Sequence, residues 1–174
     1  MAQSPNKTIL VVDDEPDVRA FLSAALIEAG FTVVTAGDGF EALERINEAI
    51  PDLVSLDLVM PGKSGVKFHR ELIKNKRWAH IPVLIVTGHA RDDLGRADLK
   101  ELAMSGPGIY LEKPVKPENY IAAIKRILGL DTNANETALA EAVVLQSEVK
   151  NLIDDADPET LRKLKDMLRR EKHS

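Results

Sequence analysis

The sequence predicts a doubly wound α/β domain followed by a C-terminal helical appendage. Up to about residue 130, short apolar runs rich in β-branched residues alternate with segments whose apolar residues recur at helical spacing. Such alternation is typical of a parallel sheet covered by helices on both faces. Beyond residue 130 the apolar pattern is helical only. We therefore expect an α/β domain over residues 1–130, and a linker with two helices over residues 131–174.

The composition excludes several classes of protein. The chain has 174 residues, 44% of them hydrophobic, which is enough for one ordinary domain with a real core and a small appendage. Because it has no cysteine, it can form no disulfide and no cysteine-bound zinc site. The net charge of -5 argues against nucleic-acid or membrane binding by the whole surface. We find neither a membrane-spanning apolar run nor a signal-peptide pattern, so we expect a cytoplasmic protein without membrane insertion.

The α/β domain is predicted to hold five strands and five helices. The expected strands are residues 9–12, 31–36, 51–57, 81–86 and 109–111. The expected helices are residues 16–29, 40–50, 66–76, 91–105 and 117–128. Pro16 and Pro117 suit the first turn of a helix, and Gly30 and Gly129 suit the position after its last turn. The predicted topology is that of a flavodoxin-like sheet with the strands in the order 2-1-3-4-5.

Polar residues stand at the carboxyl ends of four of these strands. They are Asp13 and Asp14, Asp57, Thr87, and Lys113. In the predicted order the first and third strands are neighbours, so the three carboxylates should converge at the edge where ligands bind in such sheets. Each residue alone has an ordinary explanation, since an acidic pair favours the start of a helix and lysine is usually exposed. Four such strand ends at one edge favour a functional site.

The residue types at this edge suit phosphoryl transfer. Two carboxylates about 4 Å apart repel each other by about 4 kcal/mol at an effective dielectric constant of 20, so the site needs a cation. Mg²⁺ prefers oxygen ligands, keeps several waters and often bridges to a phosphate. The ammonium of Lys113 and the hydroxyl of Thr87 suit phosphoryl oxygens. Asp57 is then placed to attack a phosphoryl donor as a carboxylate nucleophile.

Four motifs occur in the order and spacing of a known family. They are Val11-Val12-Asp13-Asp14-Glu15-Pro16, Asp57-Leu58-Val59-Met60-Pro61-Gly62, Val86-Thr87-Gly88 and Leu111-Glu112-Lys113-Pro114. At these residues the chain resembles the receiver domain of two-component response regulators, over about residues 7 to 130. The resemblance implies that a sensor histidine kinase or a histidine phosphotransfer protein donates a phosphoryl group to Asp57. It also implies a phosphoacceptor that assists its own phosphorylation and dephosphorylation, and not an enzyme with a separate substrate.

The same resemblance implies the ligands of a magnesium ion. Asp14 would bind Mg²⁺ directly, Asp13 would assist, often through water, and Asp57 would complete the acidic set. Val59 would contribute its backbone carbonyl oxygen.

The resemblance further implies a conformational switch. Lys113 and Thr87 would bind the phosphoryl oxygens, and Thr87 would move together with Tyr110 to alter the surface formed by the fourth helix and the fifth strand. The Lys113–Pro114 bond is expected to be cis. In the family, the residues at the positions of Val59 and His89 tune how long the phosphoryl group persists. The two residues present here do not predict that lifetime. His89 could serve as a metal or proton ligand, although a loop histidine is the simpler interpretation.

The appendage admits two interpretations. Its apolar stripe contains Ala138, Ala142, Leu145, Val149, Leu152 and Ala156, and continues after Pro158 with Leu161, Leu164 and Leu168. The first interpretation is a helical hairpin for protein contact. Its apolar stripe would form a homodimer through residues 133–172, dock on a downstream protein target, or pack on the α/β domain. The second is a DNA-binding transcriptional regulator, since the last helix is basic. The acidic turn at residues 154–157 would repel the phosphates of DNA, which argues against DNA binding.

A third hypothesis is a magnesium-dependent phosphatase. The haloacid-dehalogenase family places a second aspartate two residues after its aspartate nucleophile, as an acid/base. Here that position is Val59, which argues against this activity.

Overall fold

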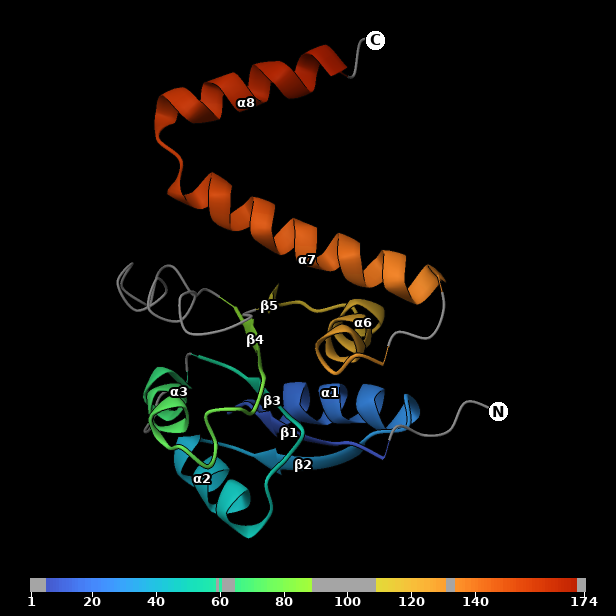
Figure 1. Cartoon of the computed structure of the whole chain (residues 1–174), viewed down its shortest axis with the longest axis vertical. Coiled ribbons are helices and arrows are strands. Elements are labelled where there is room, and N and C mark those ends of the chain that lie inside the picture. The colour runs from blue at the N-terminus through green and yellow to red at the C-terminus, as the bar shows by residue number, and fades with distance from the viewer. Residues whose placement is uncertain (1–5, 59, 61–64, 89–108, 131–133, 172–174) are drawn as a thin grey trace.

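The computed structural model describes residues 6–58, 60, 65–88, 109–130 and 134–171 of the chain. In chain order the elements are β1 (Thr8–Val12), α1 (Pro16–Glu28), β2 (Thr32–Ala36), α2 (Gly39–Glu48), β3 (Leu53–Leu56), α3 (Gly65–Lys74), β4 (Val83–Thr87), β5 (Ile109–Glu112), α6 (Pro117–Ile127), α7 (Ala134–Asp155) and α8 (Pro158–Glu171). The five described strands are parallel, in the order β2-β1-β3-β4-β5 (Figure 1). The doubly wound fold and its strand order are therefore confirmed. The helix predicted over residues 91–105 lies outside the described residues.

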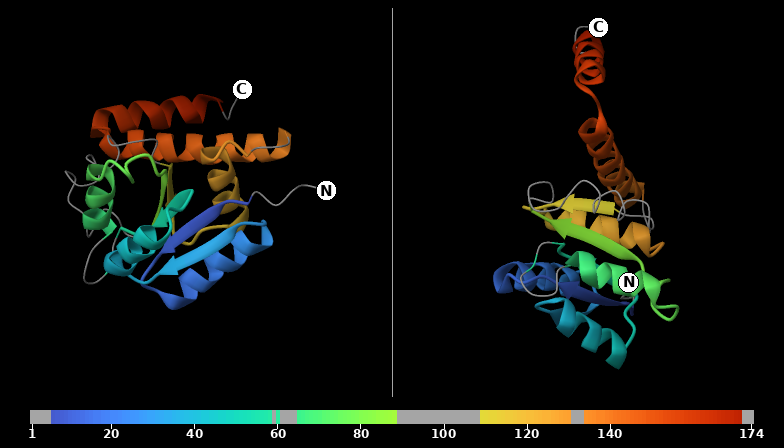
Figure 2. Two further views of the ribbon diagram at one scale, coloured as in Figure 1. Left: turned by 60° about the horizontal axis from the view of Figure 1, so that its bottom comes forward. Right: turned by 90° about the vertical axis from the view of Figure 1, so that its left-hand side faces the viewer.

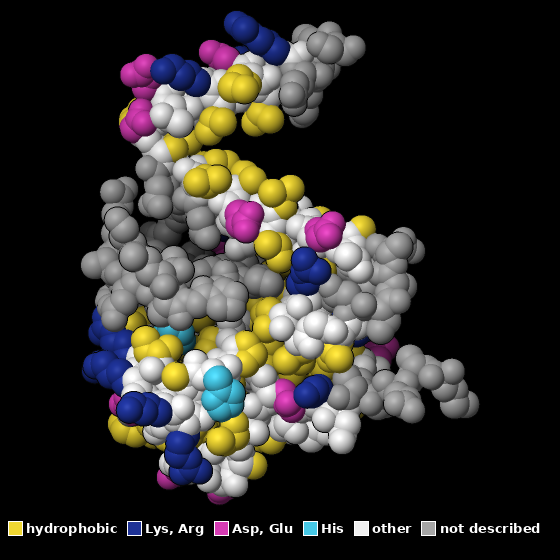
Figure 3. Space-filling model, viewed as in Figure 1, with side chains coloured by type: hydrophobic (Ala, Val, Ile, Leu, Met, Phe, Trp, Pro, Cys, Tyr) yellow, Lys and Arg dark blue, Asp and Glu magenta, His cyan; other side chains and the backbone are white. Residues whose placement is uncertain are grey.

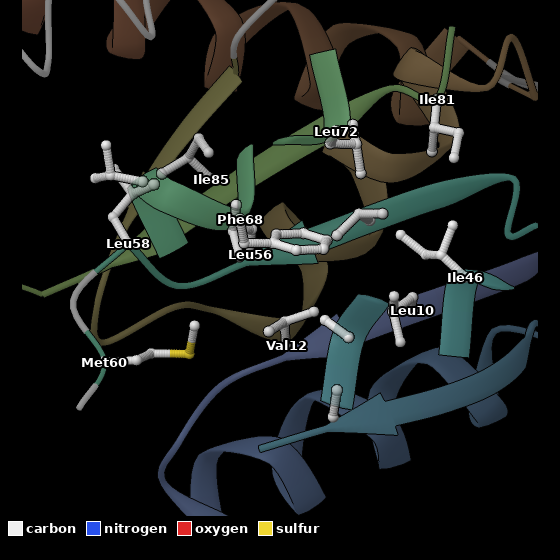
Figure 4. Close-up of a cluster of buried hydrophobic side chains, with 14 residues drawn as sticks. Leu10, Val12, Ile46, Leu56, Leu58, Met60, Phe68, Leu72, Ile81 and Ile85 are labelled. Carbon is white, nitrogen blue, oxygen red and sulfur yellow. The ribbon is translucent and has the colours of Figure 1, made fainter. Parts of the chain in front are cut away.

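The sheet separates two hydrophobic clusters, because successive side chains of a strand point to opposite faces. Leu10 and Val12 of β1 pack on one face with residues of α2 and α3, among them Phe68 (Figure 4). Ile9 and Val11 belong to the cluster on the other face, together with residues of α1 and α6. Both faces of β1 are therefore buried, which explains why its sequence is a continuous apolar run.

The ends of two helices follow the predicted signals. Pro16 and Pro117 occupy the first positions of α1 and α6. Gly30 and Gly129 follow the ends of these helices with φ angles of 91° and 66°, in the left-handed region that favours glycine.

The third strand starts later than predicted, at Leu53. Before it, the side chain of Asp52 accepts a hydrogen bond from the backbone N–H of Thr8 at 2.8 Å and another from Lys7 Nζ at 3.2 Å. These bonds tie the entry of β3 to the start of β1. They hold the two central strands in register at the end opposite to the predicted site.

The first C-terminal helix packs on the α/β domain through a face that the sequence pattern does not single out. α7 lies along α6 and β5, with Ala140 and Val143 buried (Figure 1). Val143 joins the hydrophobic cluster on the α1 and α6 face of the sheet. The predicted stripe instead points away from the domain, since Leu145 and Leu152 are 60% and 71% exposed.

The second C-terminal helix extends away from the domain. α8 diverges from α7 after a short connection, so the predicted hairpin is open (Figures 1 and 2). All its described side chains, from Pro158 to Arg170, are exposed. The described helices include none with both the length and the apolar character needed to cross a membrane.

Candidate functional site

Four carboxylates gather at the carboxyl ends of β1 and β3. The parallel register of these strands places Asp13 and Asp57, which directly follow them, side by side. Carboxylate oxygens of Asp13, Asp14, Glu15 and Asp57 all lie within 4.8 Å of one another. Asp13 and Asp57 are only 1% and 4% exposed. Buried carboxylates this close together require a positive charge nearby.

Lys113, the residue after β5, supplies one positive charge. Its Nζ lies 2.8 Å from Asp13 Oδ2, 3.1 Å from Asp57 Oδ2 and 3.3 Å from Glu15 Oε1. Burial by itself would lower the pKa of Lys113, but the hydrogen bond to Asp13 and the charges of Asp57 and Asp13 raise this pKa above its ordinary value. Lys113 is therefore a permanent cation. One ammonium cannot neutralise four carboxylates, so the site keeps a negative charge.

Backbone contacts hold the acidic residues at the edge of the sheet. The backbone N–H of Glu15 donates to Asp13 Oδ1 at 2.9 Å, and Arg19 Nη1 donates to the Asp13 carbonyl oxygen at 2.6 Å. The backbone N–H of Asp57 donates to the Val12 carbonyl oxygen at 2.9 Å, which extends the pairing of β1 and β3. The carboxylates are thus fixed by rigid elements and not by a free loop.

The first residue of α3 lies directly against the backbone of Asp57. Gly65 is buried, and its N–H donates to the Leu58 carbonyl oxygen at 3.1 Å. A Cβ atom on Gly65 would lie 2.6 Å from Leu58 Cα, and closer still to the Asp57 carbonyl oxygen. Only glycine therefore allows α3 to approach the site this closely.

The acidic cluster fits a magnesium ion. It offers only carboxylate oxygens, which are the ligands that Mg²⁺ prefers. Asp13 and Asp57 are buried, whereas Asp14 is half-buried and Glu15 is exposed, so one side of the cluster is accessible to water. Val59, the expected carbonyl ligand, lies outside the described residues.

The structure brings the predicted Asp13, Asp14, Asp57 and Lys113 together. Thr87 is the last residue of β4, paired in register with Glu112 next to Lys113, but its side chain lies outside the part of the chain that is described.

Tyr110 lies within β5, in register with Ile85, and its side chain is likewise outside the description. The Lys113–Pro114 bond is cis, as predicted.

Glu15 and Gly65 are additional residues of the site. Glu15 could have been predicted from the acidic run Asp13-Asp14-Glu15. The role of Gly65 depends on a contact that the spacing of residues in the sequence does not reveal.

Residues 9–125 match the model of the response regulator receiver domain. The chain is 33% identical over 122 residues to the phosphate regulon transcriptional regulatory protein PhoB of Escherichia coli, covering 70% of this chain and 52% of that protein. It is 37% identical over 124 residues to the alkaline phosphatase synthesis transcriptional regulatory protein PhoP of Bacillus subtilis, covering 71% of this chain and 49% of that protein. It thus spans about half the length of these relatives.

A solved structure supports the same assignment. The chemotaxis response regulator CheY4 of Vibrio cholerae superposes with a TM-score of 0.61 and 28% identity, covering 70% of this chain and 98% of that one. The strand order, which is that of flavodoxin-like folds, the family match and the acidic edge agree with one another. The chain therefore belongs to the response regulator receiver domain family of two-component systems.

Proposed function

We propose that this chain is a response regulator whose Asp57 accepts a phosphoryl group from a sensor histidine kinase or a histidine phosphotransfer protein. The observation that carries the proposal is the buried Asp57 carboxylate, bound by Lys113 within an acidic cluster at the sheet edge. Family membership supports a histidine kinase as the partner. We propose the cytoplasm as the location of this exchange.

In the proposed reaction, a carboxylate oxygen of Asp57 forms a bond to phosphorus while the bond from phosphorus to the donor atom breaks. The electron pair of the broken bond stays with the donor. The ammonium of Lys113, now shared by Asp13 and Asp57, would then bind oxygens of the phosphoryl group, with the Thr87 hydroxyl as a proposed second donor. The chain thus acts as an acceptor that assists its own phosphorylation and dephosphorylation, and not as an enzyme acting on a separate substrate.

We propose that Asp13, Asp14 and Asp57 hold Mg²⁺, with the backbone carbonyl of Val59 as a further ligand. When bound, Mg²⁺ would neutralise the charge that gathers between the carboxylates and the phosphoryl oxygens. The support for this proposal is the all-oxygen donor set and the negative charge that Lys113 leaves uncompensated.

Asp14→Ala is expected to weaken Mg²⁺ binding by about tenfold or more, because losing one charged ligand removes upwards of about 1.4 kcal/mol. Calorimetric titration of Mg²⁺ into both proteins measures the difference. Asp17→Ala is the matched control, since Asp17 is an exposed acidic residue in the first turn of α1 and lies outside the cluster. An unchanged affinity in Asp14→Ala would show that the acidic run does not bind the metal.

The proposed output is a switch in which Thr87 and Tyr110 alter the surface of the fourth helix and β5. α7 is seated on β5 and α6, and its Lys150 pairs with Glu112, the residue before Lys113. A shift of β5 would therefore reach α7. Moving such an equilibrium from 1:99 to 99:1 takes about 5.5 kcal/mol of differential interaction.

Backbone amide chemical shifts across β5 and α7 should change when the phosphoryl mimic beryllofluoride is added. Identical chemical shifts with and without it would contradict the switch.

The alternative output is DNA binding. The printed names of PhoB and PhoP describe transcriptional regulators. The family match ends at residue 125, before α7, and α7 exposes Glu141 and Glu148, which phosphates would repel. We therefore propose that α7 and α8 contact protein, either a second copy or a downstream target. Specific binding of duplex DNA that is lost in Arg162→Ala with Arg169→Ala would favour the alternative.

A further inference from the structure

The two C-terminal helices carry most of the large apolar side chains that are exposed in the described residues. They include Leu145, Val149, Leu152 and Ile153 of α7, and Leu161, Leu164, Met167 and Leu168 of α8. Figure 3 shows hydrophobic side chains of both helices along the sides that face each other across the open angle between α7 and α8. We call these eight side chains the C-terminal apolar surface. Eight exposed large apolar side chains on two adjacent helices of a monomer indicate an interaction site.

α8 is a capped helix whose described side chains, from Pro158 to Arg170, are all exposed. The carboxylate of Asp157 caps its start, accepting hydrogen bonds from the backbone N–H of Glu159 at 2.9 Å and of Thr160 at 3.1 Å. The Thr160 hydroxyl also donates to Asp157, at 2.6 Å, and this bond together with the two backbone bonds lowers the pKa of Asp157. An isolated helix of 14 residues is marginal in water. A helix of this length whose large apolar side chains are 36% to 64% exposed therefore needs a partner.

The apolar stripes of the two helices match in length. Leu145, Val149 and Leu152 of α7 follow each other by four and then three residues, and Leu161, Leu164 and Leu168 of α8 by three and then four. In each stripe the first and last residues are thus seven positions apart, or about two helical turns. Helices with apolar residues at this spacing pack side by side with interlocking side chains.

The two helices also carry opposite charge. Between Ala134 and Asp155, α7 has five acidic residues and one lysine. Between Pro158 and Glu171, α8 has five basic residues and three acidic ones. Within one chain these complementary helices diverge after their short connection (Figure 1). In a second copy of the chain, each helix can find the oppositely charged helix that diverges from it within its own chain.

We propose that the C-terminal apolar surface binds a second copy of this chain, with α8 of each copy packed on the outward face of α7 of the other. The contact is self-complementary, as a twofold dimer requires. It combines the four helices into a bundle in which both stripes are covered. The opposite face of α7 stays on its own α/β domain, since Ala140 and Val143 are buried there. This inference rests on the proposed role of α7 and α8 in protein contact, and makes the partner specific.

Charge reversal in trans tests the pairing. Glu141 and Glu148 are exposed on α7, and Arg162 and Lys165 are exposed on α8. A variant with Glu141→Lys and Glu148→Lys should be monomeric, because its basic α7 repels α8 of the second copy. A variant with Arg162→Glu and Lys165→Glu should be monomeric for the converse reason. An equimolar mixture should dimerise, since each helix then meets one of opposite charge.

The oligomeric state is measured on the full chain by light scattering after size-exclusion chromatography at low salt, with and without beryllofluoride. We expect a dimer of the unaltered chain in at least one of these states, and its recovery in the mixed variants. Leu145→Glu with Leu152→Glu should abolish it. Two controls should leave the dimer unchanged: Ile27→Glu, at a side chain of α1 that is 62% exposed, and Glu44→Lys on the exposed face of α2.

A monomeric full chain in both states would overturn the proposal. So would a mixture of the two charge-reversed variants that stays monomeric, because intrachain pairing of α7 and α8 predicts that result. Labelling of Asp57 by acetyl phosphate is measured on the same variants and is expected to be unchanged. Loss of the dimer with normal labelling removes only the dimer, whereas absent labelling of the unaltered chain removes the proposed phosphoacceptor function.

Discussion

Asp57→Asn should abolish Mg²⁺-dependent phosphorylation by acetyl phosphate while the protein stays folded. A neutral amide is a poor nucleophile, so the new bond to phosphorus cannot form. The amide has nearly the volume of the carboxylate, and its introduction reduces the repulsion among the four clustered carboxylates. We therefore expect a midpoint of thermal unfolding equal to or above that of the unaltered chain. Phosphate-affinity electrophoresis measures the labelling, and circular dichroism the unfolding.

Asp52→Asn is the matched control for this substitution. Asp52 precedes β3 at its amino end, where it pairs with Lys7 away from the acidic cluster. Its loss should leave the labelling unchanged. Labelling of Asp57→Asn at the level of the unaltered chain would remove Asp57 from the proposed role.

Gly65→Ala should lower both the free energy of unfolding and the rate of phosphorylation. The added Cβ would lie 2.6 Å from Leu58 Cα, and this backbone belongs to the segment that follows the phosphoacceptor. Either α3 or that segment must move, and overpacking of this kind costs typically about 1–3 kcal/mol. Urea unfolding measures the stability, and initial rates of labelling by acetyl phosphate measure the displacement of Asp57.

Gly88→Ala controls for the loss of a glycine. A Cβ on Gly88 would meet nothing within 4 Å, so this substitution should change the free energy of unfolding little. Equal stability of the two variants would show that α3 does not approach Asp57 as closely as the structure indicates.

The sequence predicts the fold well because its strands are buried on both faces. The run from Ile9 to Val12 is apolar throughout, and each of these residues is at most 1% exposed. Spacing also predicts the acidic edge, because the carboxyl ends of neighbouring parallel strands meet by geometry. Such features are local in sequence or follow from topology alone.

What the sequence does not predict depends on contacts between distant segments. α7 has two apolar stripes. From the sequence alone, the stripe with the larger side chains, such as Leu145 and Leu152, is the expected packing face. The structure buries the smaller Ala140 and Val143 instead, since small residues let α7 approach α6 and β5 closely. The ion pair between Lys113 and Glu15 is likewise not predicted by the sequence, because it depends on the path of the lysine side chain across the site.

The phosphorylated residue can be located directly by tandem mass spectrometry of the full chain after incubation with acetyl phosphate and Mg²⁺. The proposed function predicts one modified side chain, Asp57, and loss of the modification when the metal is chelated beforehand. A phosphoryl group on any other residue, or labelling of Asp57 that is unaffected by chelation, would contradict it.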